Sequence, residues 1–228
     1  MTDQQTSLQP EKYRTLSFDC YGTLIDWENG ILGFLQPLLD SYDVHVIDEW
    51  ILEFFSEREP EEQAKGGRYR DVLARVLSSF GTRLAFIPGT DALDSFASSI
   101  EYWQPYEEAV DALQRLRKKY DLAVISNVDD DLFELSRKNL GIRFDHVITA
   151  EQVGAYKPAR KMFDAALQVL EGPVLHVAQS RYHDIQPATA LQLDTAWINR
   201  AGPSAARDVD VTPTATYADL RSLADALC

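Results

Sequence analysis

The hydrophobic pattern of the chain changes near Pro105. Before it, between about residues 27 and 99, apolar residues recur at helical spacing, as Ile31, Phe34 and Leu38 do. After it, short apolar runs alternate with amphipathic stretches of roughly 10–15 residues, which indicates strands alternating with helices. This alternation is typical of βαβ units and of a parallel sheet.

The predicted elements follow from these runs. Buried strands are expected at residues 14–18, 122–125, 146–149, 174–178 and 195–198. Helices are expected between them at residues 106–120, 129–140 and 160–170. The glutamate-rich stretch 58–67, which ends in two glycines, is expected to be a loop, and the polar residues 1–14 a frayed N-terminal tail.

The fold class predicted from this order is α/β, with a Rossmann-like, doubly wound parallel sheet. Residues 10–26 and 105–228 are expected to form the core that carries the sheet. Residues 27–104 are expected to form a helical domain inserted directly after the first strand.

Composition narrows the classes of partner. The formal net charge of −14 argues against a nucleic-acid partner, because binding phosphates requires a basic surface. No apolar run approaches the roughly 18 residues of a membrane span, and the N-terminus lacks the apolar region of a signal peptide. Only Cys20 and Cys228 are present, so no disulfide framework is expected, and a cytoplasmic location fits best.

Polar side chains gather directly after the predicted strands. Asp19 and Thr23 follow the first, Ser126 and Asn127 follow the second, and Lys157 follows a later one. The segment 179–184 follows the fourth and contains Gln179, Ser180, Arg181 and Asp184. Ligands of open α/β sheets bind beyond the carboxyl ends of the strands, so a site for a small anionic substrate is expected there.

These segments resemble the motifs of the haloacid dehalogenase superfamily. FDCYGTLIDW (18–27) resembles its first motif, Ser126-Asn127 its second, Lys157-Pro158 its third and HVAQSRYHD (176–184) its fourth, in the same order. The inserted helical segment lies where the family carries its cap domain. Within the superfamily, the first motif and TAWINR (195–200) are similar to the L-2-haloacid dehalogenase branch.

The resemblance implies a reaction and a role for each residue. Asp19 would attack C2 of a short 2-haloacid and expel halide, and water would then hydrolyse the ester on Asp19. Lys157 would keep Asp19 ionised, Thr23 and Ser126 would donate hydrogen bonds, and Asp184 would orient Lys157 or the water. The residues expected to bind substrate are Tyr21, Cys20, Asn127, Gln179, Ser180 and Arg181. The resemblance also implies a homodimer and no cofactor.

Two positions favour dehalogenation over phosphate transfer. Phosphatases of the superfamily carry a second Asp two residues after the nucleophile, where this chain has Tyr21, and a phenol is a weaker acid. They also open the fourth motif with an Asp that binds Mg²⁺, where this chain has Gln179. A metal-independent dehalogenase is therefore expected. The alternatives are a Mg²⁺-dependent phosphatase acting on a small metabolite and a non-catalytic protein that binds an anion or a partner.

The chain also departs from the dehalogenase pattern. Gln179 and Arg181 stand where that branch usually has Ser and Asn. The halide-binding arginine of the cap cannot be assigned among Arg58, Arg68 and Arg70, so Arg181 is a hypothetical anion ligand. His176 and His183 are expected to be structural or exposed, and Cys20 to pack as a small apolar residue on the opposite side of its strand.

Overall fold

The computed structural model describes residues 8–200 and 209–228, and its centre is an all-parallel six-stranded sheet. The strand order is β3-β2-β1-β4-β5-β6. The strands are β1 (Thr15–Phe18), β2 (Asp121–Ser126), β3 (His146–Thr149), β4 (Val174–Ala178), β5 (Asp194–Ile198) and β6 (Ala215–Tyr217). The strand order reverses beside β1, which pairs with β2 on one side and β4 on the other. The predicted doubly wound α/β fold is confirmed.

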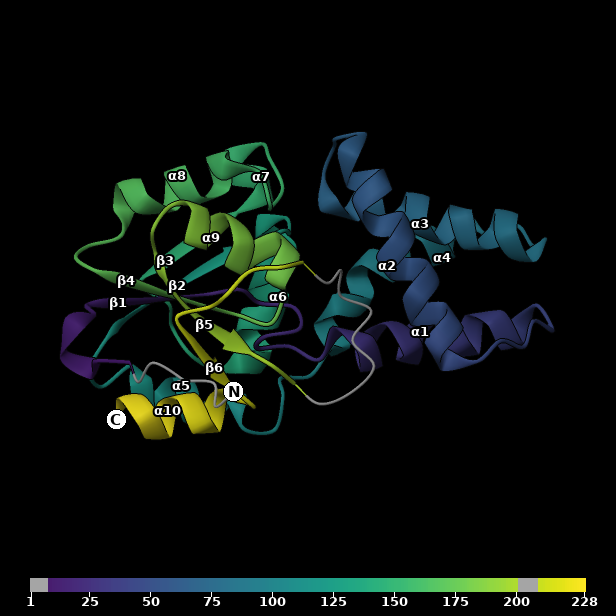
Figure 1. The fold of residues 1–228 in the computed structure, drawn as a ribbon. Helices are drawn as coiled ribbons and strands as arrows, with labels where there is room; N and C mark the ends of the chain where they lie inside the picture. The colour runs from purple at the N-terminus through teal and green to yellow at the C-terminus, as the bar shows by residue number, and fades with distance from the viewer. Residues whose placement is uncertain (1–7, 201–208) are drawn as a thin grey trace.

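Helices cover both faces of the sheet, which explains why β1 and β4 are buried along their whole length. Figure 1 shows α7 (Ala150–Val153), α8 (Arg160–Val169) and α9 (Gln186–Ala190) above the sheet, and α5 (Ala109–Leu116) and α10 (Leu220–Leu227) below it. The remaining core elements are α6 (Asp130–Leu140), the 3-10 turn η1 (Pro10–Lys12) and the π-helical turn η3 (Arg181–Ile185).

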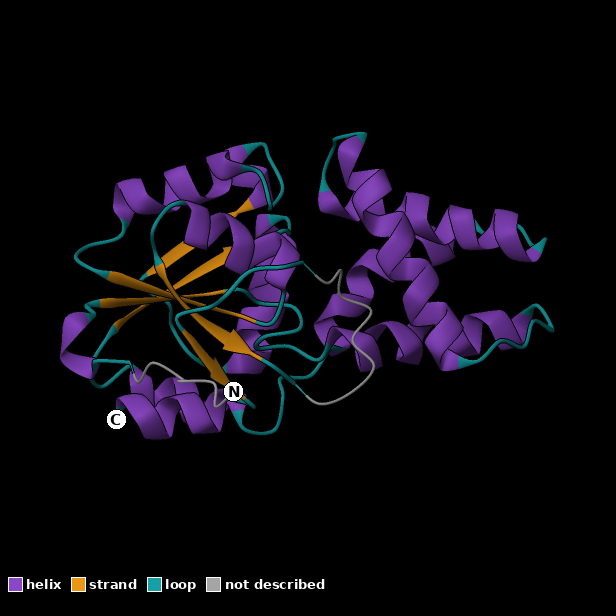
Figure 2. Cartoon of the chain, viewed as in Figure 1, coloured by secondary structure: helices purple, strands orange, loops and turns teal. Residues whose placement is uncertain are grey.

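Between β1 and α5, the chain from Trp27 to Tyr102 forms helices joined by short loops and lies to one side of the sheet (Figures 1 and 2). It consists of α1 (Trp27–Ser41), α2 (Asp48–Ala64), α3 (Tyr69–Leu84), α4 (Thr90–Ser98) and the 3-10 turn η2 (Ser99–Tyr102). Helix α3 buries Val72, Val76 and Phe80 at the spacing of one helical face. We call this segment the cap; the boundaries at residues 27 and 104 stay a prediction. None of the helices in the described part of the chain has the length and apolar character of a membrane-crossing segment.

The expected loop at residues 58–67 is wrong over most of its length, because α2 continues to Ala64. Glutamates gave this stretch the appearance of a solvated loop, yet Glu62 is only 5% exposed. Its carboxylate accepts hydrogen bonds from Lys65 Nζ at 2.6 Å and Arg75 Nε at 3.0 Å. Burial alone would raise the pKa of Glu62, but these two cations lower it below its ordinary value. An ion pair with another helix, not an apolar stripe, thus holds this part of α2.

The chain ends also differ from expectation. Leu8 and Tyr13 are buried, and the Tyr13 hydroxyl donates to Asp194 Oδ2 at 2.7 Å, so residues 8–14 are not a frayed tail. Residues 1–7 of that expected tail lie outside the described residues. Strand β6 and helix α10 were not predicted, and the helix expected at 106–120 is shorter, beginning at Ala109 and ending at Leu116.

A carboxylate of the core binds the N-terminus of a cap helix. Asp129 precedes α6, but its side chain makes no capping bond to that helix. Instead, Asp129 Oδ1 accepts from the Tyr69 amide at 2.8 Å and Oδ2 from the Arg70 amide at 3.0 Å, both in the first turn of α3. Asp129 is 1% exposed. Free backbone N–H groups and the helix dipole favour a carboxylate at this place.

Surface ion pairs surround this contact. The Arg68 guanidinium lies 3.0 Å from Asp131 and 3.3 Å from Glu151, and the Arg70 guanidinium lies 2.6 Å from Asp131. All three pairs join the cap to the core. Arg68 and Arg70 are therefore engaged in holding the two parts together.

We predict that Asp129→Asn lowers the free energy of unfolding by about 1–3 kcal/mol, because a buried charged acceptor of two amide N–H groups is replaced by a neutral one. Urea unfolding followed by circular dichroism measures this. The matched control is Asp131→Asn, whose side chain is 56% exposed and whose ion pairs are worth about 0–1 kcal/mol. Equal losses in the two variants would contradict the role given to Asp129.

Candidate functional site

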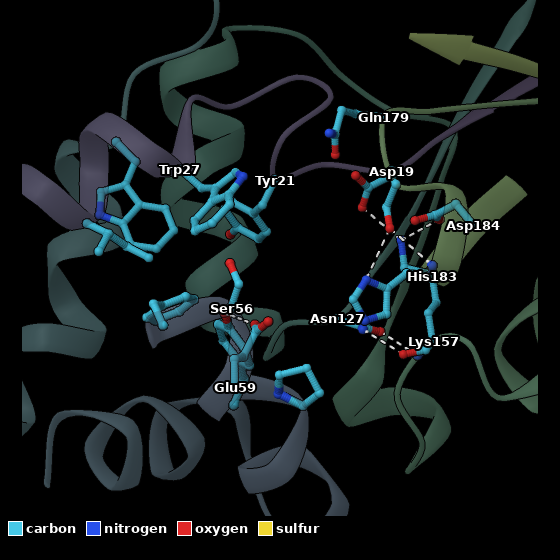
Figure 3. Close-up of a pocket in the computed structure, with 16 residues that line it drawn as sticks. Asp19, Tyr21, Trp27, Ser56, Glu59, Asn127, Lys157, Gln179, His183 and Asp184 are labelled. Carbon is cyan, nitrogen blue, oxygen red and sulfur yellow. Dashed lines mark hydrogen bonds and ion pairs between the residues drawn. The ribbon is translucent and has the colours of Figure 1, made fainter. Parts of the chain in front are cut away.

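A cavity of about 110 Å³ lies between the carboxyl ends of the strands and the cap (Figure 3). This is the edge of the sheet at which the sequence predicts a site. The core supplies Asp19, Tyr21, Asn127, Lys157, Gln179, Ser180, His183 and Asp184 to its wall. The cap and its return to the core supply Trp27, Ile31, Phe55, Ser56, Glu59, Pro60, Tyr69 and Trp103.

The centre of the core side is a buried cluster of three charged groups. Lys157 Nζ donates to Asp19 Oδ1 at 2.8 Å, to Asp184 Oδ1 at 2.7 Å and to the Ile125 carbonyl at 2.8 Å. An ammonium group has three donors, so all of them are used. Lys157 is 2% exposed, Asp184 1% and Asp19 6%. Buried charges are tolerated when they are paired in this way.

The cluster shifts the pKa of each member. Burial alone would lower the pKa of Lys157, but Asp184 and Asp19 raise it, so the side chain stays an ammonium ion. Burial raises the pKa of Asp19, and the negative charge of Asp184 adds to this, while Lys157 and Thr23 oppose it. Burial alone would also raise the pKa of Asp184, but Lys157 and His176 lower it below its ordinary value. Of the two carboxylates, Asp19 is therefore the more basic.

The loop after β1 orients Asp19. Thr23 Oγ1 donates to Asp19 Oδ2 at 2.8 Å and accepts from the backbone N–H of Gln179 at 2.9 Å. The second bond directs the hydroxyl proton of Thr23 to the carboxylate. Gly22 has a φ of 95°, and a Cβ there would meet Trp27 Nε1 at 3.2 Å and Gln179 Oε1 at 3.3 Å. Glycine at this position lets the loop turn tightly under the cavity.

Asn127 and Ser126 occupy different places after β2. The Asn127 amide accepts from the Lys157 backbone N–H at 2.6 Å and donates to the Lys157 carbonyl at 3.1 Å. Asn127 therefore positions the segment that carries Lys157, besides lining the cavity. Ser126 is buried, and its hydroxyl has no hydrogen-bond partner among the described residues. Unlike Asn127, Ser126 is not part of the cavity wall.

The structure brings some of the expected binding residues to the cavity and not others. Tyr21 lines it, and the Tyr21 hydroxyl lies 2.9 Å from Ser136 Oγ. Ser180 lines it and accepts from the His183 amide at 3.0 Å. Cys20 is fully buried and is not part of the wall. Arg181 is not part of the wall either: its guanidinium lies over the Trp197 ring and donates to the Val211 carbonyl at 2.7 Å.

His176 is a partner of the cluster that sequence reasoning described only as structural or exposed. It is fully buried, with Nε2 3.0 Å from Asp184 Oδ1 and Nδ1 2.9 Å from Ser17 Oγ. Ser17 and His176 are register partners on β1 and β4. Ser17 lies two residues before Asp19 and so on the same face of its strand. The sequence signal for this contact was a polar residue, Ser17 or His176, within each of two buried strands.

Sequence reasoning did not predict the residues that α2 contributes to the wall. Phe55, Ser56, Glu59 and Pro60 come from α2, and residues 58–64 of that helix were expected to be a loop. Arg58 pairs with Glu61 at 2.8 Å and lies over the Phe54 ring, away from this cavity. Within residues 8–200 and 209–228 no arginine lines the cavity, and Lys157 is its cationic side chain.

The donor set does not fit a carboxylate-rich magnesium site. The described residues contain no group of three or more His, Cys, Asp or Glu side chains placed to hold a metal ion. Asp19 and Asp184 are both hydrogen-bonded to Lys157, and the nearby third side chain is the amide of Gln179 (Figure 3). Mg²⁺ prefers carboxylate oxygens in near-octahedral geometry.

Known proteins are similar to this chain in sequence or in fold. The (S)-2-haloacid dehalogenase H-109 of Pseudomonas putida is 29% identical over 220 residues, which cover 91% of this chain and 95% of that protein. The pyrimidine 5'-nucleotidase YjjG of Escherichia coli (strain K12) is 30% identical over 159 residues, covering 66% and 68%. The solved L-2-haloacid dehalogenase of Xanthobacter autotrophicus with chloropropionic acid covalently bound superposes with a TM-score of 0.80 at 19% identity, covering 93% and 97%.

The family model of the haloacid dehalogenase-like hydrolases matches residues 13–188 of this chain. That range contains β1 to β4, the whole cap and every charged member of the cluster around Lys157. The chain belongs to the haloacid dehalogenase-like hydrolases.

Proposed function

We propose that this hydrolase removes the halogen from a short 2-haloacid through an ester on Asp19, without a metal ion. The observation that carries the proposal is the state of Asp19: a buried carboxylate at the cavity wall, held by Lys157 Nζ and Thr23 Oγ1 at 2.8 Å each. A carboxylate fixed in a site poor in water is a competent nucleophile for displacement at carbon.

The first step forms a C–O bond between one Asp19 oxygen and C2 of the substrate. The carbon–halogen bond breaks and halide leaves with its electron pair, so no proton is needed. A step that needs no proton suits a site with Tyr21 at this position. The phenol of Tyr21 is hydrogen-bonded to Ser136, and burial raises its pKa well above the ordinary range.

The second step is the attack of water on the carbonyl carbon of the Asp19 ester. The bond between that carbon and the oxygen attached to C2 breaks. This oxygen takes up one proton of the water as the 2-hydroxyacid leaves, the other proton passes to solvent, and Asp19 is a carboxylate again. Lys157 stabilises the negative charge that develops on the carbonyl oxygen. Asp184 lines the cavity and uses only Oδ1 for Lys157 and His176, so Oδ2 remains to orient the water.

The rival function is that of a metal-dependent phosphatase, favoured by the similarity to pyrimidine 5'-nucleotidase YjjG. An alkoxide leaving group needs a proton from an acid. The position two residues after Asp19 holds Tyr21, and the magnesium-binding position of the fourth motif holds Gln179. These two residues weigh against the rival.

We expect halide release from 2-chloropropionate in EDTA, and we expect Asp19→Asn to reduce it at least about 10³-fold, because an amide cannot form the ester. Halide is measured by ion chromatography for each enantiomer, with unfolding in urea to show that the variant folds. If the unchanged protein releases no halide but releases phosphate from p-nitrophenyl phosphate only with Mg²⁺, the rival is correct.

The pH profile of the first step should follow Asp19. Burial raises the pKa of Asp19, so the rate of the pre-steady-state halide burst should fall as pH decreases through a value above about 3.9, the ordinary aspartate value. In Asp184→Asn the neighbouring negative charge is gone, so this acidic limb should move to lower pH. Stopped-flow detection of the burst between pH 3 and 8 gives the acidic limb of the unchanged protein and that of Asp184→Asn. A limb that stays in place or moves upward in Asp184→Asn would contradict the assignment.

A further inference from the structure

The cavity wall opposite Asp19 carries an acid. Glu59 of α2 lines the cavity, and Figure 3 shows it across from Asp19, Lys157 and Asp184. The Tyr69 hydroxyl donates to Glu59 Oε1 at 2.7 Å, whereas Oε2 makes no hydrogen bond within the described part of the chain. The tyrosine holds the carboxyl group in place and leaves one oxygen for a ligand.

Among the described residues, the cavity wall offers no unpaired Lys or Arg side chain to balance the charge of Glu59. Three carboxylic acids, Asp19, Glu59 and Asp184, share the wall with one ammonium group, that of Lys157. The three donors of Lys157 are taken by Asp19, Asp184 and the Ile125 carbonyl. An acid that lacks a cationic partner and faces two other carboxylates is costly unless a ligand supplies the partner.

The Ser56 carbonyl and hydroxyl beside Glu59 can also accept hydrogen bonds. Pro60 has no N–H, so it cannot donate to the carbonyl of Ser56 one turn earlier in α2. The Ser56 hydroxyl makes no hydrogen bond within the described residues, and Figure 3 shows its side chain directed into the cavity. Both residues line the same wall as Glu59.

Aromatic rings complete this end of the cavity. Trp27, Phe55 and Tyr69 lie on the wall with Glu59, and Trp27 and Phe55 are 5.6 Å apart between ring centroids. The faces of aromatic rings attract organic cations, and indole does so most strongly. Acceptors, an acid and aromatic faces together are the chemistry that recognises an ammonium group.

We infer that the substrate carries an ammonium group at the end remote from the carbon attacked by Asp19, and that Glu59 is the residue that selects it. The inference rests on the proposed function and gives its substrate class: a short 2-haloacid with an amine on its side chain. Such a zwitterion places its carboxylate near the core and its ammonium group at Glu59. Burial raises the pKa of Glu59, and a bound cation would oppose this and favour the ionised carboxylate.

An isosteric pair of substrates tests the selection. In 2-chloro-4-aminobutyrate an ammonium group replaces the terminal methyl group of 2-chloropentanoate. We expect kcat/KM for halide release, corrected for spontaneous release, to be at least about tenfold higher for the amine, because a charge-assisted contact is worth that much or more. In Glu59→Gln, which keeps an acceptor for Tyr69, the ratio should fall to about one.

The matched control is Glu57→Gln. Glu57 belongs to the same helix, its side chain is 61% exposed, and it is not part of the cavity wall. This variant should keep the preference of the unchanged protein. A preference that is absent from the unchanged protein, or that survives in Glu59→Gln, overturns the inference.

A binding experiment separates this inference from the proposed reaction. Calorimetry with 4-aminobutyrate and pentanoate, in the protein and in both glutamate variants, requires no chemistry. Tighter binding of 4-aminobutyrate that is lost only in Glu59→Gln supports the ammonium site even if no halide is released, in which case the proposed function fails. Halide release from both haloacids without any preference in binding supports the function and overturns the ammonium site.

Discussion

The interaction on which the site depends is the buried contact of one ammonium group with two carboxylates. Lys157 lies between Asp19 and Asp184 and uses its third donor on the carbonyl of Ile125. If the ammonium group were removed, two negative charges would remain close together in a place shielded from water. The cluster therefore needs all three members, and they come from three segments far apart in the sequence. Asp19 follows β1, Asp184 follows β4, and Lys157 follows β3 and α7. The parallel sheet brings these segments to one edge, because all its strands end on the same side and the order is β3-β2-β1-β4.

The cap forms the second wall of the cavity. It covers the cluster with aromatic rings, and it is fastened to the core by Asp129 at the N-terminus of α3 and by the ion pairs of Arg68 and Arg70. Arg68 and Arg70 therefore serve the contact between cap and core, and the cavity has an acid, Glu59, on its cap side. An acid on the cap side, with no arginine among the described residues of the wall, distinguishes this site from one that surrounds a simple anion with cations.

The core of the fold and of the site was accessible from the sequence, since it depends on local patterns. Five of the strands were predicted, and the residues that follow them include all three charged members of the cluster. The cap side was not accessible. Glu62 is buried beside Arg75 of another helix and forms an ion pair with it, and the spacing of apolar residues in the sequence does not reveal such a pair. The direction of Glu59 depends on how α2 packs, and the use of Arg68 and Arg70 depends on acids about 60 to 80 residues away. These are properties of tertiary structure.

The central claim is that Asp19 forms a covalent bond with the substrate, and a single turnover in ¹⁸O-labelled water tests it most directly. With enzyme in excess over 2-chloropropionate, water attacks the Asp19 ester, so the first molecule of lactate carries an unlabelled oxygen taken from the carboxylate. Mass spectrometry of the product and of the peptide that contains Asp19 should then find the label in the peptide. Label in the lactate and none in the peptide would show that water attacks the substrate itself, and would contradict the account.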